Sequence, residues 1–155
     1  VAQKNVHCYV FGEHGDSSFV PWSVANISNI PIEECKKLVL GNGQVAPDLN
    51  YAEVEEYVKK SGGTVIQRKG ATFYAVSMAV CHICKCLSID AGTALTVSTM
   101  MHGEYGVDDV CLSTLCLVNR TGLRGKVLSP LTEEETKKFQ ASAAKLKEVL
   151  SQITY

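Results

Sequence analysis

Three apolar segments that follow one another closely constrain the fold of this chain more than any other feature. They cover residues 95–101, 110–118 and 125–128, and each has the composition of a β-strand. The connections between them, residues 102–106 and 119–122, are short and contain glycine. Connections this short favour antiparallel neighbours. We therefore predict an antiparallel meander in the second half of the chain.

The other elements do not alternate strictly between strand and helix. Residues 6–11 and 19–27 are typical of strands, and residues 32–40 have helical character up to a turn signal at 41–43. A doubly wound parallel sheet requires regular alternation. No Gly-x-Gly-x-x-Gly follows a strand anywhere in the sequence. We expect an α+β domain without the usual nucleotide cradle.

Two helices are predicted in the middle of the chain. Asn50 and Glu53 have capping-box spacing, so a helix should begin after Asn50 and end at the Ser-Gly-Gly break of residues 61–63. Residues 71–89 are apolar on every side of a helical wheel, which predicts a long, buried core helix. The apolar face of the first helix would carry Val54, Tyr57 and Val58.

A C-terminal amphipathic helix is predicted after a second capping box. Thr132 and Glu135 form that box. The helix then presents a single apolar stripe, while lysines cover its outer face. Such a stripe fits docking onto the helix's own domain better than binding to a partner. The stripe consists of Phe139, Ala143, Leu146, Leu150 and Ile153.

Composition bounds what this chain can bind. Its 155 residues suit one domain, and 46% hydrophobic with 20% charged residues is typical of a globular protein. A net charge of −1 argues against nucleic acid or anionic lipid as the main partner, because both attract basic surfaces. No apolar run reaches the ~18 residues that span a membrane. Seven cysteines, an odd number, favour a reducing, cytoplasmic setting over a disulfide framework.

His14 is the leading candidate for a catalytic residue. It lies in a Gly-Glu-His-Gly-Asp-Ser sequence that directly follows the apolar residues 6–11. Imidazole has an unperturbed pKa that lets it exchange a proton near neutral pH. The flanking Gly12 and Gly15 let a ligand come close, because they carry no Cβ. The residues alone also fit a structural histidine in a polar turn, in which Asp16 satisfies backbone donors.

Other candidate groups have structural alternatives. Cys81, Cys84 and Cys86 suggest a metal or thiol site, but Cys86 points away from Cys84 on one helix at ~100° per residue, which favours core packing. Thr72, at the expected start of the core helix, could cap that helix or touch a small ligand. Structural or solvated roles are expected for His7, His82, His102, Arg120 and Arg124.

Several segments resemble the L-lactate dehydrogenases of the lactate/malate dehydrogenase family. Residues 6–17, followed by Pro-Trp-Ser at 21–23, resemble the family's active-site segment. Residues 69–75 resemble its substrate-loop helix in a form common among bacteria, and residues 122–125 with 131–135 are similar to its C-terminal region. The likeness extends over essentially the whole chain. It implies that residues 1–155 form the C-terminal, substrate-binding domain of a bacterial-type member.

The resemblance implies a chemistry and a set of site residues. Members of the family transfer a hydride between NAD and a small 2-hydroxy acid, with L-lactate and pyruvate the pair implied here. His14 would be the acid/base catalyst, Thr72 would line the substrate pocket, and Val76 would wall the nicotinamide ring. His7 matches a position that helps bind fructose 1,6-bisphosphate in allosteric bacterial members, although members without that control also have a histidine there.

The resemblance also implies groups that this sequence does not contain. The NAD-binding domain, an aspartate that pairs with the histidine and two arginines that act on the substrate would precede Val1. The chain, which starts with Val1 rather than Met, is therefore expected to be inactive alone and to belong to a homo-oligomer, a tetramer in the full-length enzyme. A malate dehydrogenase domain, a non-enzymatic oligomerisation module and a thiol or zinc protein are the alternatives. Glu13 favours lactate over malate.

Overall fold

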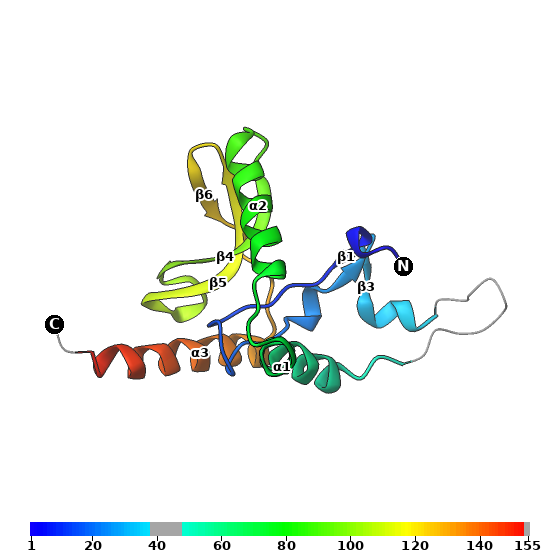
Figure 1. Ribbon diagram of the computed structural model, residues 1–155, viewed down its shortest axis with the longest axis horizontal. Helices are drawn as coiled ribbons and strands as arrows, with labels where there is room; N and C mark the ends of the chain where they lie inside the picture. The colour runs from blue at the N-terminus through cyan, green and yellow to red at the C-terminus, as the bar shows by residue number, and fades with distance from the viewer. Residues whose placement is uncertain (38–47, 154–155) are drawn as a thin grey trace.

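The computed structural model describes residues 1–37 and 48–153. Its larger sheet is a three-stranded meander (Figure 1). Its strands are β4 (Thr93–His102), β5 (Asp108–Asn119) and β6 (Gly122–Lys126), in that order and antiparallel. The predicted meander is confirmed, although β6 begins earlier than residue 125. Gly122, at φ +94°, pairs with Asn119 across a two-residue turn, so β6 starts as soon as the turn ends.

The N-terminal segment forms less strand than its sequence predicts. Three two-residue strands make a small antiparallel sheet, and the expected strands over 6–11 and 19–27 are wrong in extent. Pro21, which has no N–H and a φ of −75°, is followed by the short 3-10 helix η2 (Trp22–Val24), so the second expected strand is interrupted. The three strands are β1 (Val6–His7), β2 (Asn26–Ile27) and β3 (Ile30–Pro31).

Helix α1 (Tyr51–Lys69) is longer than its sequence predicts. Its N-terminal cap is as expected, because the Asn50 side chain accepts a hydrogen bond from the Glu53 N–H. The expected end at 61–63 is wrong: the helix continues through Gly62 and Gly63 and ends at Gly70, which has a left-handed φ of +87°. A helical glycine costs about 1 kcal/mol relative to alanine, which is too little to stop a helix that has good caps.

Helix α2 (Tyr74–Ser88) forms within the predicted range 71–89 but begins three residues later, and it is not a buried core helix in this chain. It packs beside β5, and Cys86 is its one buried residue among those described. Val76, Met78 and Val80 have exposed fractions of 57%, 71% and 53%. Apolar residues surround the whole helix, whereas the chain covers one side of it. Figure 1 shows α2 standing beside the sheet, away from α3.

The core lies between the loop of residues 11–19, the sheet and helix α3 (Glu133–Ser151). Phe11, Phe19 and Phe139 meet edge to face with ring centroids 6.4–6.5 Å apart, and all three are buried. The capping box of Thr132 and Glu135 is present as predicted. Helix α3 therefore docks onto its own domain.

Parts of the other helix predictions differ from the structure. The apolar stripe of α3 is buried at Phe139 and Ala143, whereas Leu150 is 47% exposed and Ile153 lies beyond the helix. Residues 32–40 contain the 3-10 helix η3 (Ile32–Lys37), and the turn predicted at 41–43 lies outside the described residues. Two further 3-10 turns are η1 (Gln3–Asn5) and η4 (Glu104–Gly106). In the described ranges, we find no helix with the length and hydropathy to span a membrane.

Candidate active site

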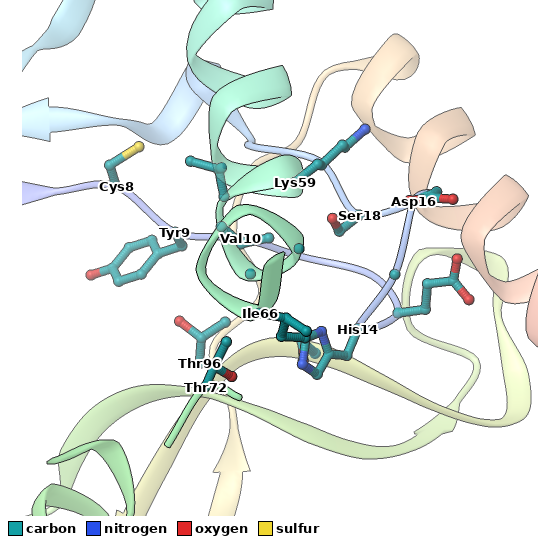
Figure 2. A pocket seen from close by; sticks show the side chains of 16 residues that line it. Cys8, Tyr9, Val10, His14, Asp16, Ser18, Lys59, Ile66, Thr72 and Thr96 are labelled. Carbon is teal, nitrogen blue, oxygen red and sulfur yellow. The ribbon is translucent and has the colours of Figure 1, made fainter. Parts of the chain in front are cut away.

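A pocket of about 740 Å³ brings together two of the residues singled out in the sequence. His14 and Thr72, which come from segments far apart in the chain, both line it. Helix α1 supplies another part of the wall, and the two long strands contribute Thr96 and Ser113. Figure 2 shows His14, Ile66, Thr72 and Thr96 gathered on one side of the pocket.

The loop that carries His14 is fixed to the sheet at its base. Phe11 and Phe19 exchange two backbone hydrogen bonds of 2.9 and 3.1 Å, which close the loop. Gly12 exchanges two more, of 3.1 and 2.9 Å, with Ser113 of β5. Gly12 has a φ of +96°, which side-chain-bearing residues rarely adopt. The sheet therefore fixes the start of the loop, and the bonds between Phe11 and Phe19 fix its end to its start.

The imidazole of His14 is exposed to the pocket and to solvent. Within the described part of the chain the His14 side chain makes no hydrogen bond. Its acidic neighbour Glu13 turns to Ser17 instead: Glu13 Oε1 accepts hydrogen bonds from the Ser17 N–H at 3.1 Å and the Ser17 hydroxyl at 2.6 Å. The ring is thus accessible to a small ligand, and its position depends on the loop backbone.

Thr72 does not cap helix α2. The N-cap residue is Phe73, which makes no side-chain capping bond, so the capping alternative for Thr72 is wrong. Thr72 lies in the connection between α1 and α2, is exposed, and lines the pocket. Val76 is on the first turn of α2 and is not among the residues that line this pocket. A ligand contact of Thr72 and a nicotinamide contact of Val76 stay predictions.

The part of the pocket wall that α1 forms was not predicted from the sequence. Val58, Gly62 and Ile66 all line the pocket, and their four-residue spacing places them on one helix face. That face was hidden because the helix was expected to end at 61–63. A helix drawn to Gly70 would have revealed the spacing.

The remaining candidates lie outside this pocket. Cys81 and Cys84 are exposed, while the buried Cys86 has its Sγ 3.8 Å from His82 Nε2 on the same helix. Among residues 1–37 and 48–153, no three His, Cys, Asp or Glu side chains are grouped so as to hold a metal ion. His7 is exposed on β1 opposite Asn26. Exposed positions are also found for His102, Arg120 and Arg124.

Comparison with known proteins identifies the class to which this fold and pocket belong. Residues 1–155 match the lactate/malate dehydrogenase, alpha/beta C-terminal domain. The chain therefore belongs to the lactate/malate dehydrogenase family, and the resemblance and the α+β fold class expected from the sequence are both confirmed.

Its relatives include named L-lactate dehydrogenases. The L-lactate dehydrogenase of Thermoanaerobacterium saccharolyticum is 41% identical over 150 residues, which are 97% of this chain and 47% of that protein. L-lactate dehydrogenase 2 of Clostridium acetobutylicum is 37% identical, with 97% and 46% covered. The chain spans about half the length of the curated relatives it matches.

Solved structures of the family have the same fold. The minor L-lactate dehydrogenase from Enterococcus mundtii, in a ligand-bound form, has a TM-score of 0.86 and 31% identity over 99% of this chain and 48% of its own. Malate dehydrogenase from Archaeoglobus fulgidus, in complex with NADH, has a TM-score of 0.79 and 28% identity, with 96% and 44% covered.

Proposed function

We propose that this chain is the substrate-binding, acid/base half of an NAD-dependent 2-hydroxy acid dehydrogenase that interconverts L-lactate and pyruvate. The observation that carries the proposal is the shared pocket of His14 and Thr72, each at the family position expected to act on the substrate. The pocket has room for a three-carbon acid, and its histidine is accessible. The kinship with named L-lactate dehydrogenases supports the choice of reaction.

The described residues fit one part of NAD. Val76, 57% exposed one helical turn beyond Thr72, offers an apolar wall to the nicotinamide ring. The phosphates and adenosine would be held by a separate dinucleotide-binding half, because the sequence has no Gly-x-Gly-x-x-Gly after a strand. When bound, NADH supplies the hydride. The same separate half would supply the carboxylate-binding arginine, so the chain alone is expected to be inactive.

His14 would move the proton of the reaction. As an imidazolium it donates a proton to the carbonyl oxygen of pyruvate while C2 gains a hydride, so the product is lactate and the ring is left neutral. In the reverse direction the neutral ring accepts the lactate hydroxyl proton. A positive ring also stabilises the charge that develops on the oxygen. Such a positioned acid/base contributes roughly 10²–10⁴ in rate.

Replacing the histidine tests the proposal. We would join this chain to the dinucleotide-binding half of the Thermoanaerobacterium saccharolyticum enzyme and follow NADH oxidation with pyruvate. In this chimaera, His14→Asn should lower kcat by roughly 10²–10⁴, because the proton donor is lost. The control is His102→Asn, at an exposed histidine outside the pocket. A His14→Asn chimaera that keeps kcat within about twofold of the parent, or turnover by the chain alone, would contradict the proposal.

Malate dehydrogenase is the second candidate, and the likeness to the Archaeoglobus fulgidus structure favours it. Glu13 beside the histidine favours lactate. Pairing this chain with the dinucleotide-binding half of either enzyme would discriminate the two. Each chimaera would be assayed with the substrate of the dehydrogenase that supplies its dinucleotide-binding half. We expect the higher kcat from the chimaera with the lactate dehydrogenase half, whereas a higher kcat from the chimaera with the malate dehydrogenase half would favour the alternative.

The same family membership supports two proposals about partners and one about cellular location. The exposed apolar side of α2 fits a homo-oligomer, a tetramer in the complete enzyme. His7, exposed on β1, is available to fructose 1,6-bisphosphate at a subunit contact. Seven free cysteines suit a cytoplasmic enzyme.

A further inference from the structure

Ser142 of helix α3 contacts the His14 loop on both sides of the histidine. Its Oγ accepts a hydrogen bond from the Glu13 N–H at 2.8 Å and lies 2.9 Å from the Ser17 Oγ. Ser142 is fully buried, with 0% of its surface exposed. A polar group buried this completely is costly unless it is hydrogen-bonded, and here its partners belong to one functional loop.

The direction of each hydrogen bond follows from the chemistry of the groups. An ionised carboxylate can only accept, so the Ser17 hydroxyl donates to Glu13 Oε1 at 2.6 Å. The Ser17 proton is then used, so Ser142 must donate to the Ser17 Oγ. Ser142 in turn accepts from the Glu13 N–H. The result is a closed ring of hydrogen bonds from Glu13 through Ser142 and Ser17 back to Glu13, and such networks polarise and rigidify their members.

We propose that Ser142 is a positioning residue for the reaction: it locks the loop backbone on either side of His14 and so fixes where the imidazole presents its proton. The proposal rests on the acid/base role proposed above for His14. The imidazole makes no hydrogen bond within the described residues, so the loop backbone determines its location in this half of the enzyme.

Close packing of Ser142 against Gly12 also holds the loop in place. A Cβ built on Gly12 would lie 2.7 Å from the Ser142 Oγ, nearer than real Cβ atoms approach. The loop backbone and α3 therefore touch directly at Gly12, while hydrogen bonds join them at Glu13 and Ser17. Displacement of a reacting group by 1 Å can cost about 100-fold in rate. Loss of the closed set of hydrogen bonds should therefore lower the rate of the chemical step.

Ser142→Ala in the chimaera tests this role. We expect kcat to fall about 10- to 100-fold, because the histidine is no longer held. The dissociation constant of NADH should stay within about twofold, since other residues hold the dinucleotide. The matched control is Ser129→Ala, which removes a buried serine hydroxyl away from the loop. The control should leave kcat within about twofold of the parent.

A second variant separates positioning from folding. Ser17→Ala removes the half-buried member of the ring and leaves α3 untouched. It should lower kcat in the same sense, and the double variant with Ser142→Ala should lose less than the product of the two single losses, because both break one network. Normal kcat in Ser17→Ala, or independent effects of the two substitutions, overturns the proposal. If His14→Asn leaves turnover normal, the proposed function itself fails.

Discussion

At the scale of single residues, an ion pair ties the turn after β4 to β6. Glu104 Oε1 accepts from Lys126 Nζ at 2.6 Å, and Glu104 Oε2 accepts from the His102 N–H at 2.7 Å. The hydrogen bond from Lys126 and that from the His102 backbone lower the pKa of Glu104 from 4.5 to about 2. A carboxylate that ionises more readily in the folded chain stabilises the fold when it is charged.

This ion pair predicts a pH dependence of stability. The contribution of Glu104 is fully present above pH 4.5 and is lost as the pH falls through about 2, because the folded pKa is the lower one. Urea unfolding across this range should show that the free energy of unfolding declines as the pH falls. This decline should be smaller in Glu104→Gln. Glu56→Gln is the control, because Glu56 and Lys60 are both well exposed and solvent screens their attraction. Equal effects of the two substitutions would contradict the prediction.

Alanine substitutions at Gly62, inside α1, and at Gly70, its C-terminal cap, should change the free energy of unfolding in opposite directions. A Cβ at Gly62 meets nothing within 4 Å in a helical position, so Gly62→Ala should raise the free energy of unfolding by up to about 1 kcal/mol. A Cβ at Gly70 also meets open space, but its φ is +87°. Gly70→Ala should therefore lower the free energy of unfolding by about 1–2 kcal/mol. Urea titration measures both, and a change of the same sign in both variants would contradict the argument.

At the scale of elements, the first turn of α3 contains a residue that joins two parts of the fold. Glu135 is buried, and its carboxylate accepts from the backbone and hydroxyl groups of both Thr132 and Ser23. Burial raises the pKa of Glu135, but the hydrogen bonds from Ser23 and Thr132 outweigh it and the pKa is lowered. The start of α3 is thereby joined to the segment that follows the His14 loop.

The cap of α3 is open to a direct test. Thr132→Ala removes the oxygen that accepts from the Glu135 N–H, and it should lower the free energy of unfolding by about 1 kcal/mol. Thr64→Ala is the matched control, because Thr64 lies inside α1 and its hydroxyl bonds back to the Lys60 carbonyl. Alanine is the better helix former there, so the control should be neutral or slightly stabilising. A loss in the control as large as in Thr132→Ala would remove the capping explanation.

At the scale of the whole molecule, local signals predicted the elements that local chemistry determines. The meander follows from short connections, and the starts of α1 and α3 follow from the caps at Asn50 and Thr132. The predicted end of α1 was wrong, because glycine is a weak helix breaker and the left-handed cap comes at Gly70. The predicted burial of α2 was wrong, because periodicity shows which residues are apolar but not whether this chain covers them.

The candidate site was predictable only in part for a similar reason. The Gly-Glu-His-Gly-Asp-Ser pattern and the family resemblance singled out His14, and resemblance added Thr72. Neither could show that the two share a pocket, since that depends on how α1 and the sheet pack. The contact of Ser142 with the loop was also invisible, because its partners Glu13 and Ser17 lie far away in sequence.

The hydrogen bond between Glu13 and Ser142 spans 129 positions of the chain. A contact of such long range forms late, because nearly all of the intervening polypeptide must be ordered or looped out first. During synthesis the polypeptide as far as Ser142 must leave the ribosome before the loop of residues 11–19 can make this contact. Formation of this contact is therefore expected among the later steps in the folding of the described residues.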